Sequence, residues 1–253
     1  MIRVSGVKKA FGEKAVLHGI DAEFNSGQVN FIIGRSGSGK SVLTKCVVGL
    51  LEVDAGLIQY GDTDFSELDV KGREKVRRQI GMLFQGGALF DSMTVLENVM
   101  FPLRMFSDMT EEERLERAME CPKRVELEGA EDRFPAEVSG GMQKRVALAR
   151  AIVGKPQYLF CDEPNSGLDP QTAIVIDNLI KDLTHEYGTT TVVISHDMNS
   201  VIEIGDSIHF LHEGEVAWRG DRKGILDSGV KSLDGFVYAS DLMKDIRKQL
   251  RKK

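Results

Sequence analysis

The stretch FIIGRSGSGKSVLTK, residues 31–45, sets a glycine-rich loop directly behind an apolar run. Residues 34–41 fit the pattern G-x-x-x-x-G-K-[ST], in which a tight loop joins a strand to a helix. The preceding QVNFIIG, residues 28–34, is rich in β-branched and aromatic residues and predicts a buried strand. A helix is predicted from about Gly39 to Leu51. This order of strand, loop and helix is typical of phosphate-binding loops, so the stretch predicts a nucleotide-binding α/β fold.

The chemistry of this loop follows from its residue types. Phosphate groups need several backbone N–H groups that point one way, and glycine permits that backbone without a Cβ clash. The N-terminal dipole of the following helix adds to the attraction. Lys40 supplies a positive charge for the β- and γ-phosphates, and the Ser41 hydroxyl is placed to ligate Mg²⁺. The predicted contacts with ATP in this region are Gly34, Ser36, Gly37, Ser38, Gly39, Lys40, Ser41 and Val42.

Two carboxylates follow a second apolar run, QYLFCDE, at residues 157–163. A carboxylate at the end of a strand beside the phosphate loop can hold Mg²⁺, usually through its water shell. We therefore assign Asp162 to the metal. Glu163 is then free to polarise the attacking water as a general base.

Further motifs give these residues a family resemblance. VSGGMQKRVALARAI, residues 138–152, comes shortly before YLFCDEPNSGLDP and resembles the signature helix of ATP-binding cassette (ABC) ATPases. Gln85 resembles the Q-loop glutamine of that family, His196 its switch histidine and Asp169 its D-loop aspartate. The motifs stand in the family's order over roughly residues 2–220, which leaves little room for coincidence.

The resemblance implies a mechanism that needs two copies of the chain. They would face head to tail around ATP, with Ser139, Gly140 and Gly141 of one copy touching the γ-phosphate held by the other copy's Lys40. Asp169 would contribute to the same composite site.

The resemblance also implies roles within one copy. His196 would contact the γ-phosphate and orient the water, and Gln85 would serve both the metal and catalysis. Phe11 lies where the family usually has an aromatic residue stacked on adenine, although a plain hydrophobic plug is an alternative.

The implied fold is an α/β P-loop NTPase of the ABC cassette type. It has a mixed core sheet, an N-terminal antiparallel β part and an inserted α-helical subdomain at about residues 86–153. The cassette would span residues 1–220 and a tail residues 221–253. Within the insertion, Pro122 is predicted to end one helix and to open a second.

Composition restricts the class of function. The chain has 253 residues, 42% of them hydrophobic, with a formal net charge of −6, which argues against nucleic acid as a partner. No apolar run approaches the roughly 20 residues that span a bilayer, and the N-terminus lacks the apolar region of a signal peptide. We therefore expect a cytoplasmic location and no channel. The cysteines have no metal-ligand spacing, which favours inert thiols.

Departures from the commonest ABC pattern suggest a narrower task. Met142 replaces the usual glutamine, Val42 stands where many members carry a hydroxyl, and an unusual segment follows Gln85. Together these features resemble the ATPases of Mla-type and Mce-associated lipid transporters. That resemblance implies phospholipid trafficking at the cytoplasmic face of the bacterial inner membrane. The partners would be integral membrane permease subunits and an envelope lipid-binding protein of the MCE type.

Other classes remain as alternatives. The nearest is the ATPase of an importer for amino acids or another small solute. A ribosome-acting ABC protein would carry two cassettes, and a DNA-repair ABC ATPase would need a long coiled coil. A small-molecule kinase would not explain the signature motif or His196.

Two segments are candidates for protein contacts. GGALFDSM, residues 86–93, is apolar enough to line a groove for a permease helix or to pack within its own insertion. The end of the tail, residues 240–253, has Leu242, Ile246 and Leu250 on one helical stripe behind Ser240 as a possible N-cap. This helix could fold back, lie on a membrane or cross to the second copy, as tails do in the lipid-transport ATPases that the chain resembles. We favour the crossing because GVKSLDGFVYAS, residues 229–240, supplies apolar anchors ahead of the helix.

Overall fold

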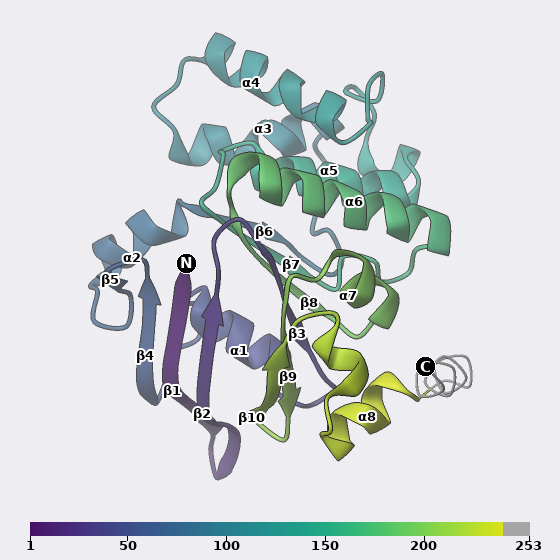
Figure 1. Ribbon diagram of the computed structural model, residues 1–253. Coiled ribbons are helices and arrows are strands. Elements are labelled where there is room, and N and C mark those ends of the chain that lie inside the picture. The colour runs from purple at the N-terminus through teal and green to yellow at the C-terminus, as the bar shows by residue number, and fades with distance from the viewer. Residues whose placement is uncertain (240–253) are drawn as a thin grey trace.

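The computed structural model describes residues 1–239, and its centre is a six-stranded sheet (Figure 1). The strand order is β10-β9-β3-β8-β7-β6, and only β10 runs antiparallel to its neighbour. The strands are β3 (Val29–Ile33), β6 (Ile80–Leu83), β7 (Tyr158–Asp162), β8 (Thr190–Ser195), β9 (Ser207–His212) and β10 (Glu215–Gly220). All residues of β3 and β8 are buried, as expected for central parallel strands covered on both faces.

A second, antiparallel sheet is built mainly from the N-terminal part of the chain. Its order is β2-β1-β4-β5, and its strands are β1 (Ile2–Phe11), β2 (Lys14–Phe24), β4 (Ala55–Tyr60) and β5 (Thr63–Asp64). The predicted combination of a mixed core sheet and an antiparallel N-terminal part is therefore confirmed.

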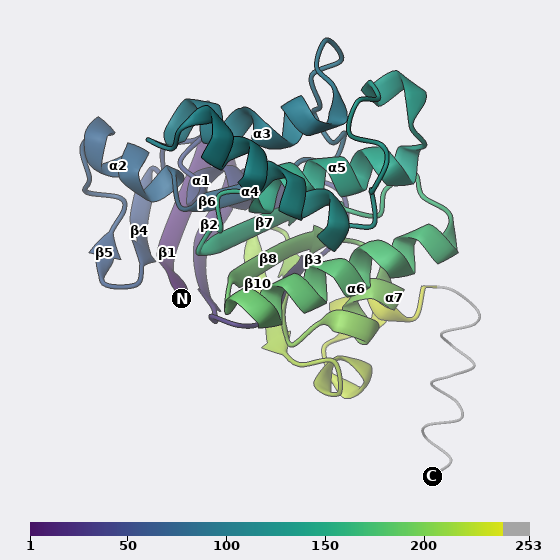
Figure 2. The same cartoon turned by 90° about the horizontal axis from the view of Figure 1, so that it is seen from above.

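The helices are divided between the two faces of the central sheet. Helix α1 (Lys40–Val47) lies between the two sheets, whereas α5 (Gly140–Ile152) and α6 (Pro170–Tyr187) lie on the opposite face (Figures 1 and 2). Successive side chains of a strand point to opposite faces of the sheet, so β7 contributes to the cores on both faces. Leu159 and Cys161 pack into one core, and Phe160 packs into the other. The remaining helices are α2 (Val70–Arg77), α3 (Val95–Phe106), α4 (Glu111–Arg124), α7 (Met198–Ile204) and α8 (Lys231–Val237), with 3₁₀ turns η1 (Pro135–Glu137) and η2 (Gly224–Asp227).

Helices α3, α4 and α5 follow β6 and precede β7, at the top of Figure 1. Helices α3 and α4 begin with capping boxes at Thr94 and Thr110, in which a threonine and a glutamate three residues later satisfy each other's backbone N–H groups. The insertion after β6 is thus helical, as the sequence predicted.

Two predicted helix boundaries are wrong. Pro122 lies inside α4, which continues to Arg124, and residues 125–134 form no helix. The Pro122 ring is buried, and this burial offsets the one intrahelical hydrogen bond that proline cannot donate. Helix α1 ends at Val47 rather than Leu51, because Gly49 adopts a φ of +76° and Leu50 N–H turns back to Lys45 O at 2.8 Å.

The described part of the tail packs onto the cassette. Ile225 of η2 and Leu233 and Val237 of α8 are buried in the core on the α5–α6 side of the sheet. The amphipathic helix predicted from Ser240 onward lies outside the described residues.

Candidate functional site

A cavity of about 650 Å³ lies at the carboxyl ends of β3, β7 and β8. In an α/β sheet with parallel strands this is the edge where ligands bind. Most of its lining residues come from the motifs identified in the sequence. They are Val16, Gly34, Arg35, Ser36, Gly37, Gly39, Lys40, Ser41, Val42, Gln85, Asp162, Glu163, His196 and Phe236.

The phosphate loop has the backbone that its glycines predict. Gly34, Gly37 and Gly39 have φ values of +152°, +81° and +105°, in the region that side chains disfavour. A Cβ on Gly34 would also lie only 2.2 Å from the carbonyl oxygen of Leu211 on β9. Both the conformation and the close packing therefore require glycine at position 34.

Lys40 begins α1 with its amine folded over the loop. Its Nζ donates hydrogen bonds to Gly34 O at 2.8 Å and Arg35 O at 3.1 Å. Burial lowers the pKa of Lys40, and the nearby carboxylates Glu163 and Asp162 partly oppose that shift. A bound phosphate would supply the amine with a stronger partner than two backbone carbonyls.

The two carboxylates have distinct surroundings. Burial and the adjacent charge of Glu163 raise the pKa of Asp162, so this end of the cavity favours a cation. The backbone N–H of Glu163 donates to Ile194 O at 2.9 Å. The residue has a φ of +47°, which turns the chain sharply at the end of β7. Glu163 Oε1 lies 2.9 Å from His196 Nδ1.

The donors available fit a Mg²⁺ that arrives with a nucleotide. Ser41, Gln85 and Asp162 line one cavity and offer only oxygen ligands from their hydroxyl, amide and carboxylate groups. Within residues 1–239, no group of three or more His, Cys, Asp or Glu side chains is arranged to hold a metal ion. Mg²⁺ is usually held by one or two protein oxygens together with substrate phosphates.

The backbone around Gln85 is tied to α5. The buried Lys144 amine donates a hydrogen bond to Gln85 O. Arg150, also buried, donates to Ala88 O at 2.7 Å and to Gly87 O at 2.6 Å. Burial lowers the pKa of both cations. The helix that carries the signature motif therefore holds the loop that carries Gln85.

The residues predicted to act on a second copy lie outside this cavity. Ser139 caps α5, where its Oγ accepts from Met142 N–H at 3.2 Å. A Cβ on Gly141 would lie 2.5 Å from Thr172 Cγ2, so the first turn of α5 packs closely on α6. Asp169 caps α6 and accepts a 2.5 Å hydrogen bond from the Thr172 hydroxyl.

Three further predicted positions do not line the cavity. Phe11, at the end of β1, is 48% exposed and does not line the cavity, and Lys9 Nζ lies 5.7 Å from its ring centroid. Gly140 also lies outside the cavity, at the start of α5. Ser38 is buried, and its Oγ has no hydrogen-bond partner among the described residues.

Sequence reasoning missed three lining residues, Val16, Arg35 and Phe236. Arg35 lies inside the quoted motif and could have been named from it. Val16 and Phe236 come from β2 and α8, and no local pattern marks either residue.

Comparisons with known proteins agree with this arrangement. Residues 17–166 match the family described as ABC transporter. The chain is 38% identical over 227 residues to the "Probable ribonucleotide transport ATP-binding protein mkl" of Mycobacterium leprae, which covers 90% of this chain and 65% of that protein. It is 36% identical over 250 residues to the methionine import ATP-binding protein MetN of Rhizobium johnstonii, covering 99% of this chain and 67% of that one.

Solved structures show the same fold. The dimeric ATP-binding cassette MJ0796, bound to ADP and Pi in a post-hydrolysis state, has a TM-score of 0.79 and 35% identity, and covers 88% of this chain and 99% of that chain. CbiO1 of Clostridium perfringens, part of the transporter complex CbiONQ, has a TM-score of 0.84 and 28% identity, and covers 99% and 98%. This chain spans about 65% of the length of the mycobacterial relatives that it matches. Its phosphate loop, its carboxylates and these matches lead to one assignment: the chain belongs to the ABC transporter family, as an ATP-binding cassette.

Proposed function

We propose that this chain is the ATP-binding and ATP-hydrolysing subunit of an ABC transporter, and that it drives an integral membrane permease. The main support for this proposal is the segment from Phe84 to Phe90, because its residues line two different cavities. Gln85 lines the phosphate cavity, whereas Phe84, Ala88 and Phe90 line a separate groove. A partner seated in that groove would press on the loop that faces the nucleotide.

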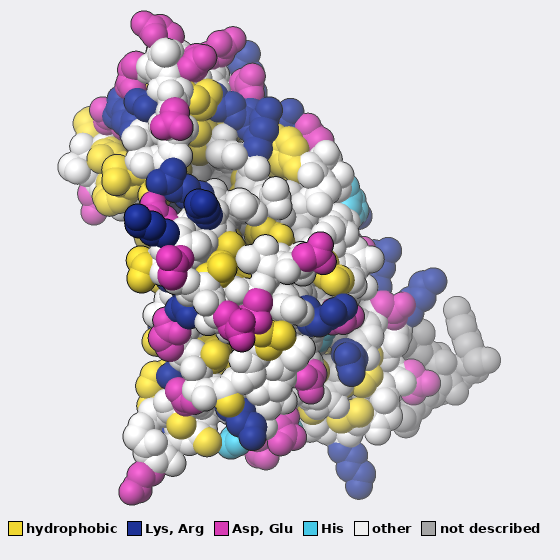
Figure 3. All heavy atoms as spheres, turned by 90° about the vertical axis from the view of Figure 1, so that its left-hand side faces the viewer, with side chains coloured by type: hydrophobic (Ala, Val, Ile, Leu, Met, Phe, Trp, Pro, Cys, Tyr) yellow, Lys and Arg dark blue, Asp and Glu magenta, His cyan; other side chains and the backbone are white. Residues whose placement is uncertain are grey.

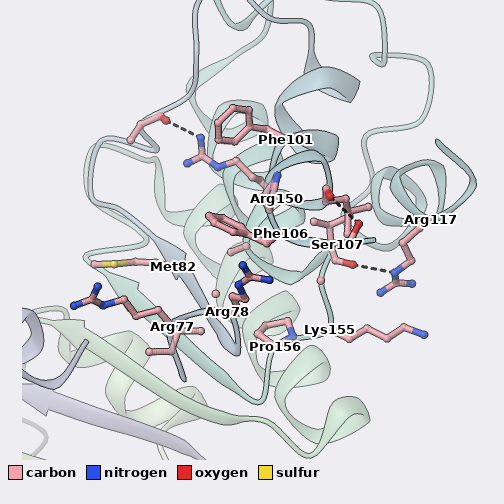
Figure 4. Close-up of a pocket in the computed structure, with 18 of the residues that line it drawn as sticks. Arg77, Arg78, Met82, Phe101, Phe106, Ser107, Arg117, Arg150, Lys155 and Pro156 are labelled. Atoms are coloured by element: carbon pink, nitrogen blue, oxygen red, sulfur yellow. Dashed lines mark hydrogen bonds between the residues drawn. The ribbon is translucent and has the colours of Figure 1, made fainter. Parts of the chain in front are cut away.

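The groove is about 780 Å³ in volume and lies between β6 and the helical insertion. Figure 4 shows Phe101 and Phe106 of α3 beside Arg78 and Arg150 in this space. Arg78 lies 5.9 Å from the Phe106 ring centroid. On the face of the molecule in Figure 3, hydrophobic and basic side chains gather where the helical part meets the body. This mixture suits an amphipathic helix of a permease.

The groove also bears on the prediction for GGALFDSM. Phe90 is 40% exposed and packs against Phe101 with ring centroids 4.6 Å apart. The segment therefore packs within its own insertion and still presents apolar surface, so the two alternatives for it are compatible.

Hydrolysis would use the residues of the phosphate cavity in separate roles. Lys40 and the phosphate loop would hold the β- and γ-phosphates, and Ser41, Gln85 and Asp162 would hold Mg²⁺, which neutralises charge on the phosphates. Glu163 would take a proton from the attacking water, with His196 orienting that water. The 2.9 Å contact between Glu163 and His196 supports this pairing.

Two copies would complete each site. Ser139, Gly140, Gly141 and Asp169 lie outside their own phosphate cavity, which is consistent with action on a second copy. The cassette MJ0796, to which this chain is similar, is dimeric. We propose that this chain also forms a dimer, with its two copies paired head to tail, and we retain Phe11 as the adenine-stacking candidate.

The cargo is best proposed from the named relatives. Two of them are named for ribonucleotide transport and methionine import, which favours the small-solute importer over lipid trafficking. The lipid prediction, with its MCE-type partner, rests on the resemblance at Met142, at Val42 and behind Gln85 alone.

None of the described helices is long and apolar enough to cross a bilayer. We propose peripheral attachment to the cytoplasmic face of the membrane through the permease.

A single charge introduced into the groove tests whether the permease binds there. Phe106→Glu places a carboxylate on a residue that lines the groove and is 53% exposed, so permease subunits should no longer co-purify while ATP still binds. Leu115→Glu is the matched control, since Leu115 on α4 is 45% exposed and does not line the groove. Loss of the permease in both variants, or in neither, would contradict the proposal. Mass spectrometry of the small molecules and lipids retained by the complex would identify the cargo.

A further inference from the structure

The tail contributes one aromatic ring to the phosphate cavity. Phe236 lies on α8, beyond the last strand of the central sheet, and still lines the cavity that contains Lys40, Glu163 and His196. The sequence motifs of the site all lie before residue 200, so none of them predicts this contribution.

A second cavity of about 560 Å³ adjoins the first. It is lined by Asn165, Ser166, Gly167, Ser195, Asp197, Met198, Asn199, Val237 and Ala239, together with three residues that also line the phosphate cavity. The shared residues are Glu163, His196 and Phe236. These three residues therefore lie where the two cavities meet.

The position of Phe236 is determined by packing. Leu233 and Val237, on either side of it in α8, are buried in the core. The Phe236 ring centroid lies 5.6 Å from that of Phe210, a fully buried residue of β9. The next residue of β9, Leu211, has the carbonyl oxygen that lies against Gly34 of the phosphate loop. One strand thus supports both the loop and the ring.

His196 lines the same two cavities as Phe236, and its imidazole is largely exposed. The His196 side chain is 68% exposed, and among the described residues it pairs with Glu163. A phenyl ring neither donates nor accepts a strong hydrogen bond and cannot take the proton of an attacking water. It can exclude water from one side of the imidazole and limit its rotation, and such restraint of a reacting group lowers the barrier.

We propose that Phe236 is a positioning residue for ATP hydrolysis, which holds His196 toward Glu163 and makes α8 a part of the catalytic site. The inference rests on the proposed ATPase function. Removal of the ring should therefore slow the chemical step and leave nucleotide binding intact, because the residues that hold the phosphates are elsewhere.

Kinetics of the full chain, with its permease where that co-purifies, test the role. Phe236→Ala should lower kcat by roughly tenfold or more and leave KM for ATP within about twofold, as expected for misplacement of a reacting group. Phe236→Tyr keeps the ring and should retain most of the activity. The matched control is Leu226→Ala, because Leu226 is a half-buried residue packed on the same core but lines neither cavity. If kcat falls equally in Phe236→Ala and Leu226→Ala, the residue serves packing alone and the proposal is wrong.

A second readout does not depend on activity. The imidazole resonance of His196, assigned by NMR in the nucleotide-free chain, should shift in Phe236→Leu because the aromatic ring current is lost, and should stay in place in Leu226→Ala. An unmoved resonance in Phe236→Leu would overturn the proposal. If the unaltered chain shows no ATP turnover, the proposed function fails, while the resonance still decides whether Phe236 positions His196.

Discussion

The imidazole Nδ1 of His196 lies 2.9 Å from the carboxylate Oε1 of Glu163, although the two residues follow different strands. Strands β7 and β8 pair in parallel, with Asp162 opposite Ile194, so the residues that follow both strands emerge at one edge of the sheet. This geometry brings the proposed base and the proposed water-orienting histidine together. The register of two strands therefore determines the site's central contact.

The first prediction concerns the base. Glu163→Gln keeps the shape of the side chain and removes its ability to take a proton, so ATP should still bind while turnover falls roughly 10²- to 10⁴-fold. Steady-state phosphate release and equilibrium binding of ATP measure the two effects separately. Turnover close to that of the unaltered chain would sink the assignment of Glu163.

The second prediction concerns action between copies. Lys40→Ala should abolish ATP binding in its own copy, whereas Ser139→Arg should spare initial binding and block hydrolysis. In a mixed dimer of the two variants, one composite site carries both changes and the other carries neither. Part of the activity should therefore return on mixing. No recovery, with mixed dimers demonstrated by mass spectrometry, would count against the head-to-tail arrangement.

The third prediction concerns the tie between α5 and the loop behind Gln85. Arg150→Met keeps the apolar stem and removes the hydrogen bonds to Gly87 O and Ala88 O, and leaving the buried Gly87 acceptor unpaired costs about 1–3 kcal/mol. Urea unfolding should show that loss. Arg145→Met is the control, since Arg145 on the same helix donates to Glu126 O instead. An equal loss of stability in both variants would show that the contacts of Arg150 with the loop stabilise the fold no more than the contacts of Arg145 do.

The fourth prediction concerns pH. Burial, and to a lesser degree Arg219, lowers the pKa of His209 to about 4, while Glu23 and a backbone hydrogen bond to Phe31 oppose the shift. The unfolded chain then binds a proton between pH 6.5 and about 4 that the folded chain does not. Stability should fall as the pH falls through this window, by about 3 kcal/mol in all.

A variant isolates this contribution from those of the carboxylates. His209→Phe keeps an aromatic ring beside Phe24, whose centroid lies 5.2 Å away, and cannot titrate. Urea unfolding at several pH values between 7 and 4 should show a shallower pH dependence in this variant. His185→Gln, at an exposed position of α6, serves as the control. The same slope in the unaltered chain and in His209→Phe would contradict the prediction.

The fifth prediction concerns the end of the chain. Residues 221–239 contribute buried side chains to the core, so a deletion that begins at Asp221 would damage the cassette itself. Truncation after Ala239 removes only the predicted amphipathic helix. If that helix crosses to the second copy, the truncation should weaken pairing and leave ATP affinity intact. Sedimentation with the permease measures pairing, and an unchanged dimer fraction would exclude the crossing.

The sequence by itself determined the parts of the site whose requirements are local. The phosphate loop needs glycine at positions with positive φ, and residues 34–41 supply these glycines directly after a buried strand and at the start of a helix. Asp162 and Glu163 were predictable because they end an apolar run, which places them at the edge of a sheet. At Pro122 a local rule failed, because burial of the ring outweighed one missing hydrogen bond.

Only the tertiary structure decided which distant residues complete the site. Lys144 and Gln85 meet because α5 packs beside β6, and Phe236 reaches the phosphate cavity because α8 packs on β9. Contacts of this kind join residues far apart in the chain, and the residue types involved are common ones with no spacing rule. Their meeting depends on strand order and on the packing of helices over the sheet, which are properties of the whole fold and of no single stretch within it.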